Sequence, residues 1–286
     1  MWEKINRFVS THTVLSVFLL SALIIFTLTV FGISIFEMTP SIRLAVFTIG
    51  QLVLFYIVVW LMRKLLVFDI NDFRFKGIGK GFLIGWFGII FIIIAFLINF
   101  IQNRANSFIT PNIFYLLIVV LHPFVGTALF EEVLFRGLVF KVLLRKTGDS
   151  KRGIVFACVV SSALFGLVHV FNILAGAPVL PTISNVISAA ASGVFFAAVF
   201  YRTRKLLIPI IFHGLLNLSH QIYDALVSPD ALLQSAEAQA GINITWPIIF
   251  TLFGNVAMVI AGLVLLRKAK SYEFAVNKPR IDEECT

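Results

Sequence analysis

The sequence predicts an all-α protein, a polytopic membrane helix bundle of about eight transmembrane helices. Of its 286 residues, 59% are hydrophobic and 13% are charged, whereas soluble domains are roughly 45–50% apolar. The mean hydropathy is +1.00. The hydrophobic residues also gather in runs of about 20 or more, the length of an α-helix that crosses the hydrocarbon core of a bilayer. We therefore expect an integral membrane protein that is almost entirely helical.

Eight apolar runs follow one another along the chain. The first is too long for the hydrophobic region of a cleaved signal peptide, so we expect it to remain as a span. The fourth is too long for a simple crossing and contains His122-Pro123, which predicts a kink or a start at the membrane surface. The predicted spans are about 13–36, 42–66, 80–101, 113–146, 154–174, 184–203, 207–227 and 244–267.

The basic residues predict the orientation of these spans. If the loops alternate between the two sides, five groups of Lys and Arg fall on one side, and only Arg43 and Arg104 fall on the other. This asymmetry is typical of cytoplasmic loops, so we expect both termini in the cytoplasm and residues 228–243 outside. The net charge of +9 is explained in this way, and we expect no nucleic-acid partner. No soluble domain or internal repeat is evident, so residues 1–286 are predicted to form a single membrane domain.

Three charged residues, Glu131, Glu132 and Arg136, lie inside the fourth apolar run. Charges at membrane depth cost about 3 kcal/mol or more and are retained mainly where they are paired and used. Glu132 and Arg136 lie on one helix face at i,i+4 and can form an ion pair, whereas Glu131 points to a neighbouring face. A helix end at the membrane surface is the simpler explanation, but the apolar run continues through Phe140. The sequence therefore predicts a functional site here.

Two further runs carry ionisable or amide side chains. His169 lies one turn after Phe165 in the fifth run, and His213 and Asn217 share a helix face in the seventh. A single histidine in an apolar helix is often only a packed core residue, and for His169 alone this interpretation is as good as a functional one. Polar residues on three spans are costly unless they converge on a water-accessible cavity. We therefore expect these motifs to form one site with the charged residues of the fourth run.

Two other histidines are weaker candidates. His122 precedes Pro123 and is better explained as a local backbone partner than as a catalyst. His220 extends the stripe of Asn217 but lies nearer the end of its span.

In this order, Glu131-Glu132-x-x-x-Arg136, Phe165-x-x-x-His169 and His213-x-x-x-Asn217 resemble the CAAX protease and bacteriocin-processing family. This family of intramembrane proteases includes the type II CAAX prenyl endopeptidases. The motifs cover about 131–217, within a predicted motif core of about 113–227. Each motif alone is weak, but the ordered set embedded in apolar spans is specific.

The resemblance implies a role for each motif residue. Glu131 and His169 would activate a water, His213 and Asn217 would stabilise the oxyanion, and Glu132 and Arg136 would support the site. It also implies an endopeptidase of the bacterial cell membrane that needs no cofactor. Its partners would be the lipid bilayer and a peptide or protein substrate reached at the membrane, which in this family is prenylated or bacteriocin-like.

The chemistry of the residues agrees with this assignment on independent grounds. Peptide hydrolysis needs a base for water, donors for the oxyanion and an acid for the leaving amine. A buried carboxylate without a partner, such as Glu131, suits the base, while Glu132 beside Arg136 remains ionised. No Ser or Cys stands in a recognisable nucleophile motif, which disfavours a covalent mechanism.

Three alternatives stay open. A zinc protease could use Glu131, His169 and His213 as ligands, although the H-E-x-x-H signature is absent. A proton-coupled transporter could use the same residues as a relay, although the paired repeats of transporters are missing. A bacteriocin immunity protein could keep the motifs without cleaving a peptide.

Helix geometry poses one problem for a common site. At ~1.5 Å per residue, Glu131 lies about 15 Å from the nearest basic cluster, whereas His169 lies about 25 Å from Arg152. The motifs meet only if the fifth helix begins outside the bilayer or is strongly tilted.

Overall fold

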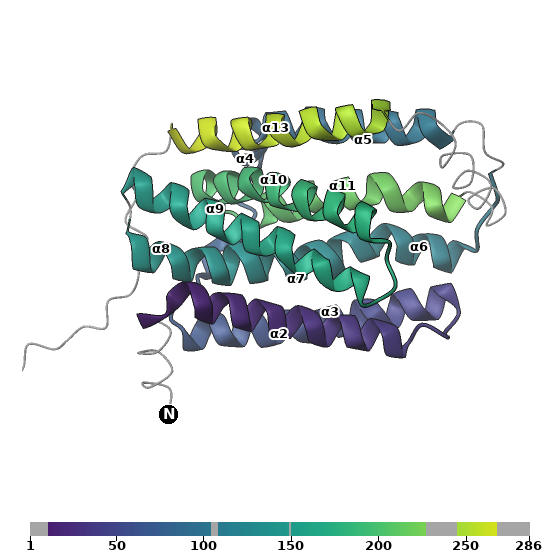
Figure 1. Ribbon diagram of the computed structural model, residues 1–286, viewed down its shortest axis with the longest axis horizontal. Coiled ribbons are helices and arrows are strands. Elements are labelled where there is room, and N and C mark those ends of the chain that lie inside the picture. Colours follow the sequence, from purple (N-terminus) through teal and green to yellow (C-terminus); the bar gives the residue numbers. More distant parts are fainter. Residues whose placement is uncertain (1–10, 104–107, 149, 227–244, 268–286) are drawn as a thin grey trace, which may run out of the picture.

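The computed structural model describes residues 11–103, 108–148, 150–226 and 245–267. All regular elements in these ranges are helices, and the long helices lie side by side along one axis (Figure 1). The predicted all-α membrane bundle is therefore confirmed. The termini and residues 228–243, on which part of the predicted orientation depends, lie outside the described residues.

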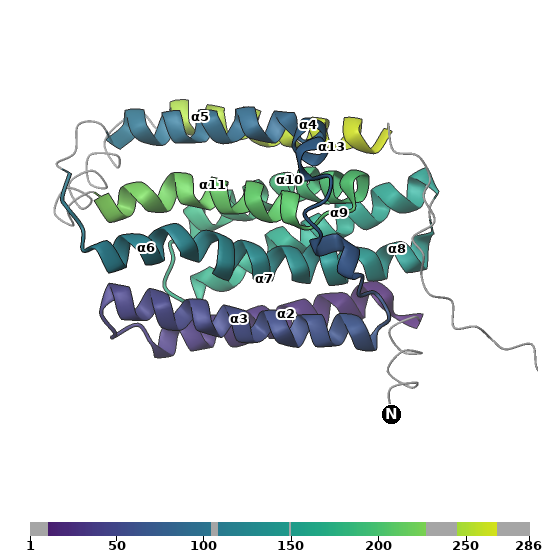
Figure 2. The same cartoon turned by 180° about the vertical axis from the view of Figure 1, so that it is seen from behind.

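The helices form stacked layers. In Figure 1, α2 (Thr13–Ser34) and α3 (Pro40–Lys64) form one outer layer, and α5 (Trp86–Asn103) and α13 (Thr245–Arg267) form the opposite one. The connection from α3 runs through η1 (Ile70–Phe73) and across the face of the bundle to α4 (Ile78–Ile84), as Figure 2 shows. The inner helices are α6 (Ile113–Leu121), α7 (Leu129–Glu132), α8 (Lys141–Thr147), α9 (Lys151–Leu167), α10 (Val179–Thr203) and α11 (Leu207–Leu226).

The number of spans differs from the prediction. By length and composition, the described residues contain five helices able to cross a membrane, or six if the bent pair Ile78–Ile84 and Trp86–Gln102 is one span. The predicted seventh and eighth spans are present as α11 and α13, but neither is among these six. Site residues such as His213 and Asn217 lower the hydropathy of α11. The count of eight is therefore not confirmed.

The helix that carries both glutamates has an unusual internal geometry. The segment Ile113–Thr147 is one helical stretch of 35 residues, but it widens into π-helix over His122–Ala128 and again over Val133–Phe140. Pro123 contributes to the first widening because it lacks an N–H group and clashes with a regular α-helical turn. Single π-helical turns within α-helices are often found at functional sites. Helix α7, with Glu131 and Glu132, lies between the two π-helical segments.

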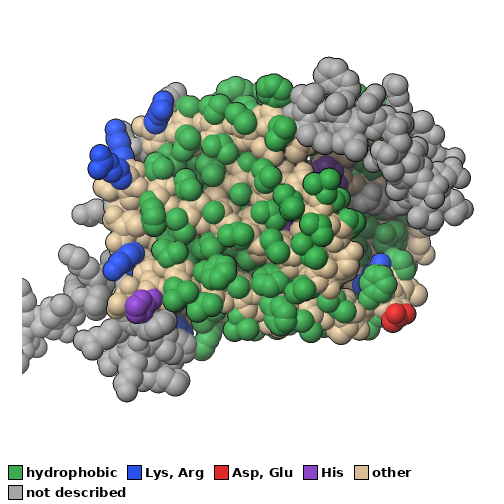
Figure 3. Space-filling model, viewed as in Figure 1, with side chains coloured by type: hydrophobic (Ala, Val, Ile, Leu, Met, Phe, Trp, Pro, Cys, Tyr) green, Lys and Arg blue, Asp and Glu red, His purple; other side chains and the backbone are tan. Residues whose placement is uncertain are grey.

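The surface has a basic end and an apolar body. In Figure 3 most of the visible lysine and arginine side chains lie at one end of the molecule, and hydrophobic side chains cover much of the rest of the face. This is the distribution that positive loops and lipid-facing helices produce. Basic residues end several helices, among them Arg63 and Lys64 in α3, Arg145 and Lys146 in α8, and Arg267 in α13.

The connector between α3 and α4 is held by a buried ion pair. The Asp72 carboxylate of η1 pairs with Nζ of Lys141, which also donates a hydrogen bond to the carbonyl of Val67 at 3.1 Å. Both charged side chains are about 5% exposed. Burial raises the pKa of the Asp72 carboxyl above its ordinary value, and the charge of Lys141 opposes this shift. The connector is thereby fixed to the helix that carries the glutamates.

The variant Lys141→Met tests this ion pair. Without the cation, the folded-state pKa of Asp72 should rise further above the unfolded value of 3.8. The cost of the buried carboxylate is then present above the folded-state pKa and disappears as the pH falls towards the unfolded value. We expect thermal unfolding in detergent to show a loss of about 3–5 kcal/mol at pH 8 and a clearly smaller loss at pH 5. The double variant Asp72→Leu with Lys141→Met should recover most of the stability, and a loss independent of pH would contradict this account.

Candidate active site

The predicted ion pair between Glu132 and Arg136 is present and completely buried. Nη1 of Arg136 donates to Oε1 of Glu132 at 3.0 Å, and both side chains are 0% exposed. Nη2 donates to the carbonyl of Gly193 in α10 at 3.3 Å. A Cβ atom at position 193 would lie 3.0 Å from Ser162 and 3.3 Å from Nη2, so glycine allows this close approach. The guanidinium also lies 4.4 Å above the centre of the Phe165 ring, which adds a cation–π contact.

His213 lies between the two glutamates. Its Nδ1 is 2.9 Å from Oε1 of Glu132, and its Nε2 is 3.7 Å from Oε2 of Glu131. An ionised carboxylate oxygen can only accept, so Nδ1 carries the proton and donates to Glu132. Glu132 Oε1 therefore accepts hydrogen bonds from two donors, Arg136 and His213. This contact joins the first and third sequence motifs.

Aromatic side chains fix the His213 ring from two sides. The Phe196 ring is stacked on it, with centroids 5.6 Å apart and an interplanar angle of 21°. The Phe165 ring contacts it edge-on at 5.7 Å. A Cβ atom at Gly214 would come within 2.4 Å of the Phe124 side chain, so glycine lets α11 pack closely against the first π-helical segment. The orientation of the imidazole is therefore determined by packing as well as by Glu132.

Glu131 has a different environment from its neighbour. Its side chain is 13% exposed, and its Oε2 atom is buried without a hydrogen-bond partner among the described residues. The 3.7 Å separation from Nε2 of His213 is too long for a hydrogen bond. Oε2 of Glu132 is likewise buried without a partner, so the two carboxylates differ in that Glu132 accepts two hydrogen bonds on Oε1 and Glu131 accepts none from a described residue.

His169 lies at the edge of this arrangement. Its Nδ1 is 2.8 Å from the carbonyl oxygen of Phe165, and because a carbonyl only accepts, Nδ1 carries the proton. In the neutral ring, Nε2 then keeps its lone pair. The Phe165 ring contacts His169 at 5.2 Å and His213 at 5.7 Å, so both histidines meet the same side chain. No hydrogen bond joins His169 to Glu131 in the structure.

Neither Asn217 nor His122 forms a hydrogen bond with Glu132 or Arg136. Asn217 follows His213 by one turn of α11 and makes no side-chain hydrogen bond to a described residue. His122 is buried, and its ring nitrogens contact the hydroxyl groups of Thr48 at 2.8 Å and Thr127 at 3.2 Å. His122 therefore contacts side chains of α3 and of its own helix, whereas the sequence predicted a contact with the local backbone. His220 is exposed near the end of α11.

The zinc alternative requires three converging ligands. Within the described part of the chain, no group of three or more His, Cys, Asp or Glu side chains could hold a metal ion. In this arrangement Glu131, His169 and His213 do not fit a zinc centre, and no chemical step is assigned to a metal here.

Sequence reasoning missed two residues that shape the site, Gly193 and Phe196. The small residues around position 193, Ser-Ala-Ala-Ala-Ser-Gly from 188 to 193, are a signal of close helix packing that was available in the sequence. Phe196 is one of 31 phenylalanines, and nothing in its sequence context distinguishes it from lipid-facing residues.

The variants Glu132→Gln and Glu131→Gln should differ in stability. Glu132→Gln leaves the buried guanidinium of Arg136 without its counter-ion, and breaking a buried pair costs about 3–5 kcal/mol. Glu131→Gln breaks no ion pair with Arg136 and should stay close to the wild-type unfolding midpoint. Thermal unfolding of both variants in the same detergent provides the measurement. Equal destabilisation would mean that the arginine depends on both carboxylates.

Part of the chain is similar to known membrane peptidases. Residues 110–219 match the family model described as type II CAAX prenyl endopeptidase Rce1-like. The chain is also 30% identical over 101 residues to "Putative membrane peptidase YdiL" of Bacillus subtilis (strain 168). That alignment covers 35% of this chain and 34% of the relative, so the chain matches about a third of the relative's length. The resemblance predicted from the three motifs is therefore confirmed, and all three motifs lie within residues 110–219, the part of the chain that matches the Rce1-like model.

Proposed function

We propose that this protein is an intramembrane endopeptidase that hydrolyses a peptide bond in a membrane-associated substrate. The Rce1-like domain supports a peptidase. The observation that carries the proposal is the difference between the adjacent glutamates. Glu132 accepts two hydrogen bonds on Oε1, whereas Glu131 accepts none from a described residue, although Oε2 is unpartnered in both. A carboxylate in the position of Glu131 can take a proton from water, and its neighbour can hold the site together.

Glu131 is the general base in the proposed reaction. It accepts a proton from water as the water oxygen bonds to the scissile carbonyl carbon, and the carbonyl oxygen becomes an oxyanion. When the carbon–nitrogen bond breaks, Glu131 returns the proton to the leaving amine. His169 assists by accepting a hydrogen bond from the water at Nε2, because its Nδ1 donates to the Phe165 carbonyl.

His213 and Asn217 stabilise the oxyanion in this proposal. Nδ1 of His213 is already bonded to Glu132, so the hydrogen bond to the oxyanion must come from Nε2. His213 therefore carries a proton on both ring nitrogens in this proposal. The Asn217 amide, one turn along α11, supplies the second donor. Donors fixed in a dry environment stabilise a developing charge more than donors in water do. The packing of Phe165 and Phe196 on the imidazole supports such a fixed orientation.

The membrane arrangement is part of the proposal. The basic end of the molecule (Figure 3) is the cytoplasmic end in a bacterial cell membrane, with both chain termini on that side. The substrate reaches Glu131 from within the bilayer or from its cytoplasmic surface. Prenylated and bacteriocin-like substrates both occur in the family that the motifs resemble, and the residues of this site favour neither.

Single-turnover cleavage of a membrane peptide in detergent tests the general base. Glu131→Gln is nearly isosteric and removes the base, so the rate of the chemical step should fall by at least about 10²-fold with little change in the unfolding midpoint. Normal turnover by a folded Glu131→Gln protein would overturn the proposed role. Gln221→Glu, at a half-buried position farther along α11, would serve as the control for a charge change that leaves the motifs intact.

Asn217→Ala tests the oxyanion donor in the same assay. Loss of one such donor typically lowers turnover by about 10²–10³-fold. The effect should appear in the rate of cleavage and leave substrate binding nearly unchanged, because the bond strengthens in the transition state. A variant that binds substrate more weakly but cleaves at the normal rate would show that Asn217 serves binding instead.

The proposed reaction needs no metal ion, because Glu131, His169, His213 and Asn217 can fill the acid–base and oxyanion roles. Cleavage should therefore persist after incubation with a chelator and removal of the metal–chelator complex. Loss of activity with recovery on added Zn²⁺ would favour the zinc alternative.

A further inference from the structure

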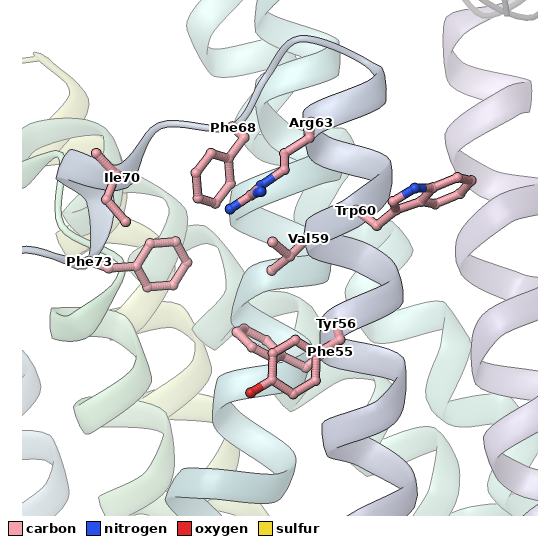
Figure 4. A pocket seen from close by; sticks show the side chains of 8 residues that line it. All are labelled: Phe55, Tyr56, Val59, Trp60, Arg63, Phe68, Ile70 and Phe73. Atoms are coloured by element: carbon pink, nitrogen blue, oxygen red, sulfur yellow. The ribbon is translucent and has the colours of Figure 1, made fainter.

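A groove lies between α3 and the connector that leads to α4, away from the paired charges of the candidate active site. Its volume is about 400 Å³, within the range of small-molecule pockets. Figure 4 shows side chains from both walls, with Val59 of α3 facing the gap between Phe55 and Phe68. The lining residues are Phe55, Tyr56, Val59, Trp60, Arg63, Phe68, Ile70 and Phe73.

The lining combines an apolar surface with one cation. Apart from Arg63, the side chains are aromatic or aliphatic, and the guanidinium lies 4.8 Å from the centre of the Phe68 ring. No carboxylate among the described residues forms an ion pair with Arg63. Tyr56 and Trp60 are largely exposed and stand one turn apart near the basic end of α3. Tyrosine and tryptophan in such positions mark the boundary between hydrocarbon and headgroups.

The walls of the groove are held in place. On the connector side, the Asp72 carboxylate pairs with Lys141, and the carbonyl of Asp72 accepts from the backbone N–H of Leu206 at 2.9 Å. Nη1 of Arg145 donates to the carbonyl of Leu65. These contacts tie the connector to α8 and to the residue that precedes α11. The groove is therefore a preformed part of the fold.

We propose that this groove binds one anionic phospholipid, with an acyl chain along the aromatic lining and the phosphate on Arg63. A guanidinium can donate two parallel hydrogen bonds to phosphate oxygens. Exposed Lys64, Arg74 and Lys76 add positive charge to the same end of the molecule. Basic pockets beside membrane helices on the cytoplasmic side attract anionic headgroups.

Other occupants fit the lining less well. A zwitterionic lipid offers Arg63 a phosphate together with a competing cation, and so gives less attraction. A peptide segment would need partners for its backbone N–H and carbonyl groups, and this mostly hydrocarbon lining offers few. The proposal goes beyond the proposed protease function and does not depend on it.

Binding can be measured with the full chain in detergent, by titration with dioleoyl phosphatidylglycerol or dioleoyl phosphatidylcholine. The phosphatidylglycerol should raise the unfolding midpoint in a saturable way, and more than phosphatidylcholine. Arg63→Gln should weaken the apparent affinity for phosphatidylglycerol about tenfold, as expected for loss of a hydrogen bond to a charged group. Arg267→Gln is the matched control, because it removes the same charge from the basic end at α13, in the opposite outer layer.

Quenching by brominated acyl chains locates the lipid. Brominated phosphatidylglycerol should quench the fluorescence of Trp60, which is identified as the component that is lost in Trp60→Phe. The variant Val59→Phe fills the groove and should reduce this quenching. An unchanged unfolding midpoint of Val59→Phe in phosphatidylcholine would verify its fold. Equal weakening by Arg63→Gln and Arg267→Gln would overturn the proposal in favour of general charge attraction. Equal quenching by brominated phosphatidylglycerol and phosphatidylcholine would overturn the proposal in favour of ordinary annular lipid. Quenching by neither lipid would overturn it in favour of a protein occupant.

Discussion

The buried ion pair of Glu132 and Arg136 is the interaction on which the rest of the site depends. A guanidinium with no exposed surface needs a counter-charge and hydrogen-bond acceptors. Its Nη1 and Nη2 find them in Glu132 and the Gly193 carbonyl, and its face packs on Phe165, whereas its Nε has no hydrogen-bond partner among the described residues. These partners come from α7, α10 and α9, so one charge holds three helices in register. The position of His213 follows, because its Nδ1 bonds to the same oxygen of Glu132.

In the proposed reaction, the two neighbouring glutamates have different tasks, one structural and one chemical. Glu132 is completely buried and accepts two hydrogen bonds on Oε1, although its Oε2 has no partner among the described residues. Glu131 is one residue away on another face, where its side chain is 13% exposed and accepts no hydrogen bond from a described residue. Catalytic sites commonly contain pairs of titratable groups whose environments assign them different roles. The helical rotation of about 100° per residue is sufficient to produce that difference here.

Sequence reasoning succeeded where the relevant spacing is local. The ion pair of Glu132 and Arg136 follows from their i,i+4 separation, and the membrane class follows from composition and the length of the apolar runs. The sequence predicted that the motifs converge but not which side chains meet, because no periodicity indicates that His213 reaches Glu132 or that His122 reaches Thr48. The number of spans was also uncertain from hydropathy, since polar site residues make α11 resemble a less apolar segment. The resemblance to a family supplied the order of the motifs, whereas the contacts of Gly193 and Phe196 required the fold.

The two π-helical segments around α7 affect how this region tolerates insertions and deletions. A π-helical turn contains about one residue more than an α-helical turn, so each segment shifts the helix faces that follow it. Removing a single apolar residue from Val133–Phe140 would leave hydropathy and length almost unchanged. It would nevertheless rotate Arg136 away from Glu132, or turn the later residues away from their neighbours. The exact number of residues in this segment therefore determines which side chains face each other, which hydropathy does not reveal. A gap placed here in a sequence alignment would imply a rotation of the helix faces.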